Sequence, residues 1–463
     1  MSNLIYRITF ILVSAFAASA LWSYLIYFDW HDQQRILQTI LLATASAFSL
    51  IVSPASINRK AVLLLVTIIS FGLISSYFAA YPYWALKEIF RYTGLALVTL
   101  FIANSSNIQK TIYIILGILL ITATLSAFQF ITTYFLAYFS ELKKIDATLI
   151  YNGFSNPRFL NQFQQIFLPV LGYSLIFLYK SNLKYKNILS IISILTLVIH
   201  WCISFSLGAR GLWLGITVSH LAALILFPRF RCLVFIQLAA ATIGFILYKS
   251  LFTLIPFWLG FEASVINPIR TGLSLRDVLW THAWNTFTQN PWFGVGPMHL
   301  SVMENAQFIA SAHPHQVILQ WLAEWGIFAT LAACSLAVWG VIHGIYFIRS
   351  ATGKNLDTAL WLSITGAFIL AQVDGVFVMP YTETWLAIII GLALGRWKNQ
   401  ESKPSSTQPL FWKSIALPTI IIMSLVLIKE APNLYNNINT HTKIYKTGYE
   451  PRFWLHGWFP INP

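Results

Sequence analysis

Two histidines that flank a single proline stand immediately before a long apolar segment, in the run Ser311-Ala-His-Pro-His-Gln-Val317. Histidine titrates near neutral pH, so it can accept a proton from a hydroxyl group under physiological conditions. A lone histidine at a membrane edge is usually an interfacial group, but two in a loop that also carries arginines favour function. We therefore expect His315 to be a catalytic base, with His313 and Glu324, about 13 Å further along a helix at ~1.5 Å per residue, as pocket candidates.

A metal site is the main alternative for this histidine pair. The pair supplies only two ligands, and the carboxylates of the same loop, Glu262, Asp277 and Glu304, do not have the spacing of a metal site. We predict that the chemistry uses no metal and no cofactor.

Arg210 lies in the short run Gly208-Ala-Arg-Gly211 between two apolar segments. The glycines let a ligand approach the backbone closely, and a guanidinium binds phosphate through two parallel hydrogen bonds. An interfacial anchor, paired with Trp213, is the alternative.

Arg276 lies in the run Ser274-Leu-Arg-Asp277, which has the residues of a capping box and predicts a helix to about Thr288, before Asn290-Pro291. The apolar positions of this helix share one face, and Arg276 lies near two tryptophans on another. Such a helix either lies in the headgroup plane or carries Arg276 into an anion site.

Four other residues are candidates for the same pocket. Arg91 either reaches the interface beside the Lys87-Glu88 pair or meets an anion inside the bundle, and Arg158 begins an apolar segment that also contains Asn161 and Gln162. Asp374 either forms a structural ion pair or neutralises an arginine. Arg270, in the long polar loop, is a further anion-binding candidate.

The composition predicts the elements that hold these residues. Apolar residues make up 57% of the 463 residues and charged residues 10%, and the mean hydropathy is +0.68. These values are typical of a polytopic helical membrane protein. The 29 basic residues are scattered between apolar segments, which argues against a nucleic-acid partner and for membrane topology. Cys202, Cys232 and Cys334 fall in apolar segments and are expected to fill the core.

The fold expected is all-α, an integral membrane bundle of about 12–13 transmembrane helices with one large periplasmic loop containing an amphipathic helix. The thirteen candidate spans lie near 5–27, 36–54, 60–80, 85–103, 109–138, 161–180, 186–206, 209–227, 231–254, 315–347, 357–379, 382–396 and 411–429. We divide the chain into an N-terminal bundle (1–254), a periplasmic loop (255–314), C-terminal helices (315–429) and a periplasmic tail (430–463).

The orientation follows from the basic residues of the short connections, which favour a cytoplasmic N-terminus and put the long polar loop outside. The first span is expected to be a retained helix rather than a cleaved signal.

Four motifs in order resemble one family: Ala209-Arg-Gly, the loop helix with Arg276, Asn290-Pro-Trp-Phe-Gly-Val-Gly296, and His313-Pro-His followed by Gln316 to Gly326. The chain is similar to the superfamily of O-antigen ligases, O-antigen polymerases and bacterial protein O-oligosaccharyltransferases, most closely over about 204–328, with an approximate core at 171–345. The run Asn156-Pro-Arg-Phe-Leu-Asn-Gln162 is similar to the pilin-glycosylating branch.

This resemblance implies transfer of a glycan from undecaprenyl pyrophosphate to an acceptor hydroxyl on the periplasmic side of the bacterial inner membrane, without nucleotide sugar or metal. By their motif positions, Arg210 and Arg276 correspond to arginines that hold the pyrophosphate, and His315 to the histidine that acts at the acceptor. Gln316 and Ala209 depart from the pattern, which usually has Asn and often Ser at these positions.

The acceptor stays open at this point. It is a protein such as pilin, lipid A-core in a lipopolysaccharide ligase, or a lipid-linked glycan in a polymerase. A different class is a flippase or transporter, in which Arg91, Glu324 and Asp374 would bind substrate or protons. The single large outer loop and the lack of visible repeats argue against that class.

Overall fold

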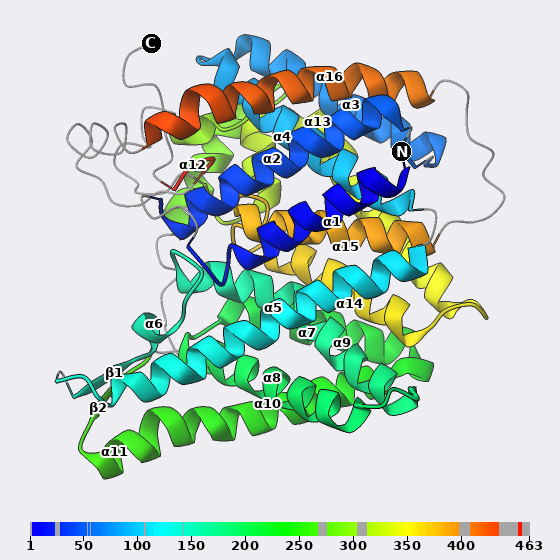
Figure 1. The fold of residues 1–463 in the computed structure, drawn as a ribbon. Coiled ribbons are helices and arrows are strands. Elements are labelled where there is room, and N and C mark those ends of the chain that lie inside the picture. Colours follow the sequence, from blue (N-terminus) through cyan, green and yellow to red (C-terminus); the bar gives the residue numbers. More distant parts are fainter. Residues whose placement is uncertain are drawn as a thin grey trace.

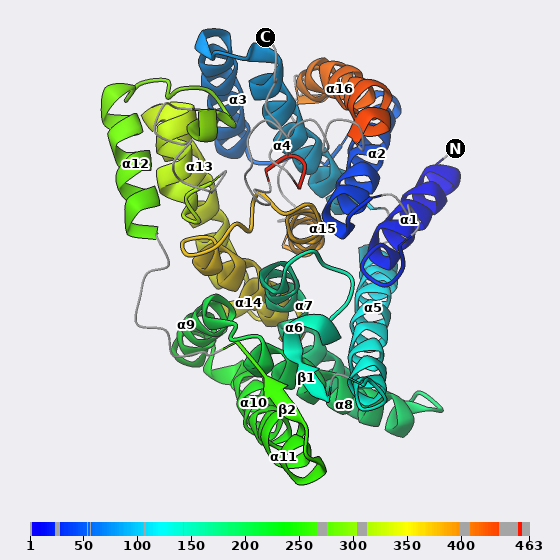
Figure 2. The ribbon, with the colours of Figure 1, turned by 90° about the vertical axis from the view of Figure 1, so that its left-hand side faces the viewer.

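The computed structural model describes residues 2–23, 28–52, 54–55, 57–105, 108–141, 143–266, 276–302, 313–397, 408–434 and 452–455. Over these ranges the chain is a bundle of long helices with two three-residue strands, so the predicted all-α fold is confirmed. Figure 1 shows the helices running side by side, and Figure 2 looks along them from one end.

The helices have the following bounds: α1 (Ser2–Ala18), α2 (Trp30–Ile51), α3 (Arg59–Phe78), α4 (Pro82–Ala103), α5 (Ile108–Ala137), α6 (Ala147–Ile150), α7 (Pro157–Lys180), α8 (Lys186–Ser206), α9 (Arg210–Leu226), α10 (Cys232–Lys249), α11 (Ile255–Leu259), α12 (Arg276–Gln289), α13 (Val317–Arg349), α14 (Asn355–Leu370), α15 (Pro380–Arg396) and α16 (Gln408–Leu425). The strands β1 (Lys144–Asp146) and β2 (Glu262–Ser264) pair in parallel.

Each of the thirteen predicted spans contains one long helix, and seven spans have the length and hydropathy to cross a membrane on their own. One boundary differs clearly at the eleventh span, which was expected to reach residue 379. Its helix, α14, ends at Leu370. The backbone that follows is not helical and presents the carbonyls of Phe377 and Val378 to side chains of other helices.

Three helices, α4, α7 and α15, are long but less hydrophobic because polar side chains face the inside of the bundle. Glu88 and Arg91 of α4, Gln162 of α7 and Glu383 of α15 are all buried. Large apolar side chains of α5, α8 and α10 are exposed instead, as expected for helices that face lipid. The bundle therefore buries polar side chains of these three helices within a largely apolar core, and other helices expose apolar side chains.

Short local signals begin the helices that surround the candidate site. The Asn156 side chain accepts a hydrogen bond from the Arg158 amide (2.9 Å) and so caps α7, whose first residue is Pro157. The Gln316 side chain caps α13 by accepting from the Leu319 amide at 2.5 Å. Gly208, with φ of 59°, makes the turn from α8 into α9.

Gly326 kinks α13 and creates a docking place for the loop after α12. Its φ of 74° breaks the helix and frees backbone carbonyls. The amides of Val295 and Gly296 donate to the Ala323 and Glu324 carbonyls at 2.9 and 3.0 Å. The Gly-Val-Gly run thus fastens the loop after α12 to α13.

α12 lies across one end of the bundle rather than along it. Figure 2, which looks along most of the helices, shows α12 in side view beside α13. The two helices pack together through Leu279 and Ala283, which are buried, while Val278 and Trp284 stay exposed. A helix thus forms where the sequence predicted one, but Val278, an apolar position expected on its buried face, is exposed.

Candidate active site

A sharp turn holds His313 and His315 at the start of α13. His315 has φ of 55°, a backbone conformation that side chains other than glycine rarely adopt. Its amide donates to Nδ1 of His313 at 3.3 Å, and the two rings lie 4.2 Å apart between centroids. The Trp280 indole donates to the Pro314 carbonyl at 3.0 Å and ties the turn to α12. The strained turn is therefore held by side chains from another element.

Asp374, from the non-helical segment after α14, lies beside His315. Oδ1 of Asp374 is 3.6 Å from Nδ1 of His315 and accepts from the Gly375 amide at 2.7 Å. The pKa of Asp374 is lowered in spite of burial, which by itself raises it, because the His315 imidazole, the Gly375 amide and Arg158 favour the carboxylate. Asp374 therefore stays ionised and lies within ion-pair distance of one ring nitrogen of His315.

One backbone and one side-chain hydrogen bond fix the start of α13 relative to the segment that carries Asp374. The Val317 amide donates to the Ala371 carbonyl at 3.0 Å, and the Gln316 amide group donates to the Gln372 side chain at 3.1 Å. Gln316, where the family pattern has Asn, therefore caps α13 and joins it to the Asp374 segment.

Three arginines from three helices share the electrostatic environment of this pair. The pKa of Arg276 is lowered first by burial; Asp374 acts in the opposite direction, and Arg158 and Arg210 add to the lowering. Arg158 and Arg210 begin α7 and α9 and are exposed at this end of the bundle. Guanidinium groups from three helices thus lie near His315 and can supply positive charge to an anionic ligand.

His313 is buried beside His315 and packs against the segment that carries Asp374. It is buried at 3% exposure and packs on Gly375, where a Cβ would lie 2.6 Å from the His313 ring. Its pKa lies well below the ordinary value of 6.5, mainly because of burial and then because of the charges of His315, Arg452, Arg158 and Arg276. A neutral His313 can accept the hydrogen bond from the His315 amide, and through this bond it stabilises the turn.

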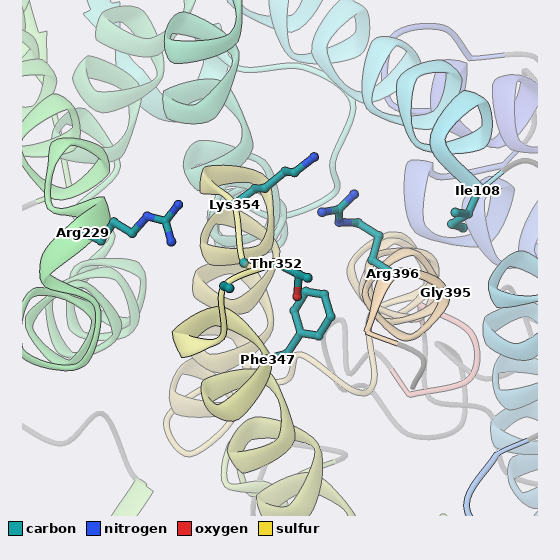
Figure 3. A pocket seen from close by; sticks show the side chains of 9 residues that line it. Ile108, Arg229, Phe347, Thr352, Lys354, Gly395 and Arg396 are labelled. Atoms are coloured by element: carbon teal, nitrogen blue, oxygen red, sulfur yellow. The ribbon is translucent and has the colours of Figure 1, made fainter. Parts of the chain in front are cut away.

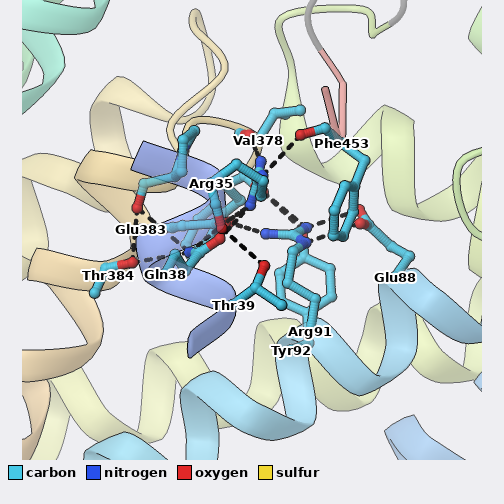
Figure 4. A network of polar contacts seen from close by, with 12 residues as sticks. Arg35, Gln38, Thr39, Glu88, Arg91, Tyr92, Val378, Glu383, Thr384 and Phe453 are labelled. Carbon is cyan, nitrogen blue, oxygen red and sulfur yellow. Dashed lines mark hydrogen bonds and ion pairs between the residues drawn. The ribbon is translucent and has the colours of Figure 1, made fainter. Parts of the chain in front are cut away.

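Arg91 and Glu324 lie in a buried network of ion pairs instead. The Arg91 guanidinium pairs with Glu88 at 2.8 Å and with Glu383, and donates to the Phe377 carbonyl. Glu383 also accepts from Arg35 at 2.6 Å. Figure 4 shows Arg35 and Arg91 converging on Glu383, with Glu88 on the other side of Arg91.

The network extends to the tail segment 452–455, whose four residues are buried in the bundle. Arg452 pairs with Glu324 at 2.5 Å and with Glu88 at 3.4 Å. Lys87 pairs with Glu430 at 2.7 Å rather than reaching the interface beside Glu88. Within the described residues, four cations (Arg35, Lys87, Arg91 and Arg452) thus face four carboxylates (Glu88, Glu324, Glu383 and Glu430). Buried charges are tolerated because they are paired in this way.

The predicted residues therefore fall into two groups. His313, His315, Asp374, Arg276, Arg158 and Arg210 gather at one end of the bundle, while Arg91 and Glu324 belong to the adjacent network. Arg270 lies outside the described residues. Sequence reasoning missed Arg35, Glu383, Glu430 and Arg452; each is an ionisable residue in or beside an apolar segment, which is the signal that could have indicated them.

In the described ranges, no three His, Cys, Asp or Glu side chains come together in a group that could hold a metal ion.

Comparison with known proteins points to one family. Residues 195–334 match the family model described as O-antigen ligase. The chain is 25% identical over 217 residues to an O-antigen ligase of Pseudomonas aeruginosa, with 45% of this chain and 48% of that protein aligned. The chain thus spans about half the length of this curated relative. The segment that is similar to this family contains Arg210, Arg276 and His315.

Proposed function

We propose that this protein is a glycosyltransferase of the bacterial inner membrane that transfers a glycan from undecaprenyl pyrophosphate to an acceptor hydroxyl at the periplasmic face. The observation that carries the proposal is the gathering of Arg158, Arg210 and Arg276 beside the His315–Asp374 pair. The similarity of residues 195–334 to the O-antigen ligase family model supports the same class of reaction.

The arginines bind and stabilise the leaving group. When the bond between the sugar C1 and the pyrophosphate oxygen breaks, the pyrophosphate departs with its electron pair as an anion. A guanidinium stabilises that charge most strongly where water is scarce, and Arg276 is partly buried. Arg210 and Arg158, at the starts of α9 and α7, approach the same anion from other helices. Arg91 pairs with Glu88 and Glu383, so we assign it to positioning rather than to donor binding.

His315 activates the acceptor. With Nδ1 directed to Asp374, Nε2 is the nitrogen that takes the hydroxyl proton as the acceptor oxygen bonds to C1. Asp374 stabilises the imidazolium that forms and fixes the orientation of the ring, as the carboxylate does in Ser-His-Asp triads. The reaction then needs no metal, because the charge of the leaving group is met by arginines.

We propose a protein serine or threonine, as in pilin, as the acceptor. The support is the run Asn156–Gln162, which is similar to the pilin-glycosylating branch and contains Arg158 in the first turn of α7. Lipid A-core and a second lipid-linked glycan are the alternative acceptors of the same superfamily.

The test is reconstitution in liposomes with an undecaprenyl-linked oligosaccharide and, in separate reactions, a pilin peptide, lipid A-core or donor alone. Mass measurement of the product identifies the acceptor, and a ladder of lengths with donor alone indicates a polymerase. Donor that crosses the bilayer without any new glycosidic bond in all three reactions would contradict the transferase and favour a flippase.

A further inference from the structure

Two adjoining cavities lie at the end of the bundle opposite to His315. They have volumes of about 400 and 670 Å³ and share Arg229, Lys354 and Arg396 in their walls. Figure 3 shows Arg229 and Arg396 approaching from opposite sides, with Lys354 between them. Arg229 follows α9, Lys354 precedes α14, and Arg396 ends α15.

The helices α13, α14 and α15 connect these cavities to the candidate active site. α13 runs from the histidine turn to Arg349, and α14 runs from Lys354 to the segment that carries Asp374. The sixteen residues of α14 alone separate the two ends by about 24 Å at ~1.5 Å per residue. The cavities are therefore a separate site, on the side where we expect the cytoplasm.

The cavity walls carry an excess of positive charge. Lys180, Arg229, Lys354 and Arg396 line them, and the described residues of the two linings include no Asp or Glu. Arg396 is held by Asp357, with nitrogen–oxygen distances of 2.6 and 2.8 Å. Among the described residues, Lys180, Arg229 and Lys354 form no ion pair with a carboxylate. Three cations thus remain to meet an external anion.

The remaining walls are apolar and aromatic. Ile108 and Phe347 line one cavity, and Tyr173, Ile176 and Phe177 contribute to the other. Helix α5 also lends Tyr113, which is 48% exposed among other outward-facing apolar side chains of that helix. Apolar walls do not contribute to the binding of a free phosphate ion. They do suit a lipid, because its headgroup contacts the cations while its acyl chains pack along the aromatic side chains toward the bilayer.

We propose that these cavities bind the headgroup of an anionic phospholipid in the leaflet opposite to the active site. Basic pockets between membrane helices on the cytoplasmic side are suited to such headgroups. The lipid would connect the end of α9, the start of α14 and the end of α15, so its binding should stabilise the bundle. This site is independent of the transfer reaction and does not rest on the proposed function.

The experiment measures thermal unfolding of the full chain in detergent with added cardiolipin, phosphatidylcholine or inorganic phosphate. We expect cardiolipin to raise the melting temperature in a saturable way and the other two to have little effect. The double variant Arg229→Gln/Lys354→Gln should need at least fivefold more cardiolipin for the same shift. The charge-retaining pair Arg229→Lys/Lys354→Arg should respond like the wild type.

The matched control is Lys184→Gln/Lys186→Gln, which removes two charges at the connection between α7 and α8, outside both cavity linings. It should keep the wild-type response. The proposal is overturned if Arg229→Gln/Lys354→Gln needs the same cardiolipin concentration as the wild type, if phosphatidylcholine protects equally, or if phosphate alone reproduces the shift. If the Gln variant does not fold, the Lys/Arg exchange and native mass spectrometry of bound lipid on the wild type decide.

Discussion

Replacing Asp374 with Asn tests the proposed catalytic pair most sharply, because it removes one charge and keeps the size of the side chain. The attraction between a protonated His315 and Asp374 at 3.6 Å is about 4 to 5 kcal/mol at an effective dielectric constant of about 20. The two side chains are 19% and 11% exposed, so we take about half of that value for solvent screening. A loss of about 2 kcal/mol in the transition state slows transfer roughly 30-fold.

The same change should not weaken donor binding. Among the described residues, Asp374 is the carboxylate that raises the pKa of Arg276, so its removal leaves more positive charge for the pyrophosphate. The assay is transfer in liposomes at saturating donor, with donor affinity measured separately. We expect kcat to fall about 30-fold while the donor KM stays equal or decreases. A variant with unchanged kcat, or one whose loss lies entirely in KM, would refute the role of Asp374 at the base.

The pKa of Asp374 also sets the expected pH dependence. Because that pKa lies below the ordinary value of 3.8 in the folded protein, the carboxylate and its contribution are present above that value and are lost only on acidification through the lowered pKa. The ratio of wild-type to Asp374→Asn activity should therefore stay constant between about pH 5 and pH 8. A ratio that falls toward one at pH 5 would contradict an ionised Asp374.

Three further changes separate the parts of the account. Arg276→Lys keeps the charge but loses the planar fork, so the donor KM should rise about tenfold, and an unchanged KM in the liposome assay would exclude a bidentate contact. His313→Asn should reduce the loss of thermal stability on acidification below pH 6.5. Because its pKa is lowered, His313 is neutral in the folded protein and protonated in the unfolded one, which costs up to about 1.4 kcal/mol of stability per pH unit. An unchanged slope of melting temperature against pH between pH 7 and pH 5 would contradict this. Arg91→Gln leaves Glu383 with one cation fewer in the buried network, so it should cost about 3 kcal/mol or more of stability, measured as a lower melting temperature. A loss of donor-binding free energy that is larger than the loss of folding free energy would instead assign Arg91 to substrate binding.

The helices were predictable because their information is local. The apolar runs, the Asn156 cap and the Gly-containing turn at Gly208 lie within a few residues of the ends that they determine. The end of α14 was misplaced because the residues after it are as apolar as a helix, and their non-helical course is fixed by hydrogen bonds from Arg35 and Arg91. Those partners come from distant helices and leave no local signal.

The site residues show the same division. His315, Arg210 and Arg276 stand in motifs whose order indicates a family, so they could be chosen from the sequence. The contact between His315 and Asp374 depends on how α13 and α14 pack, and the pairing of Glu324 with Arg452 depends on the tail entering the bundle. Such long-range pairs follow from the fold rather than from residue spacing. The catalytic role of His315 stays a prediction.

The central claim is that His315 activates an acceptor beside a cluster of arginines that holds the donor. The most direct measurement is a single-turnover mass assay in liposomes, comparing wild type with His315→Ala at equal amounts of inserted protein and with donor binding measured in both. We expect His315→Ala to bind undecaprenyl-linked donor as the wild type does but to form no glycosylated acceptor. Product formation at the wild-type rate by His315→Ala would contradict it.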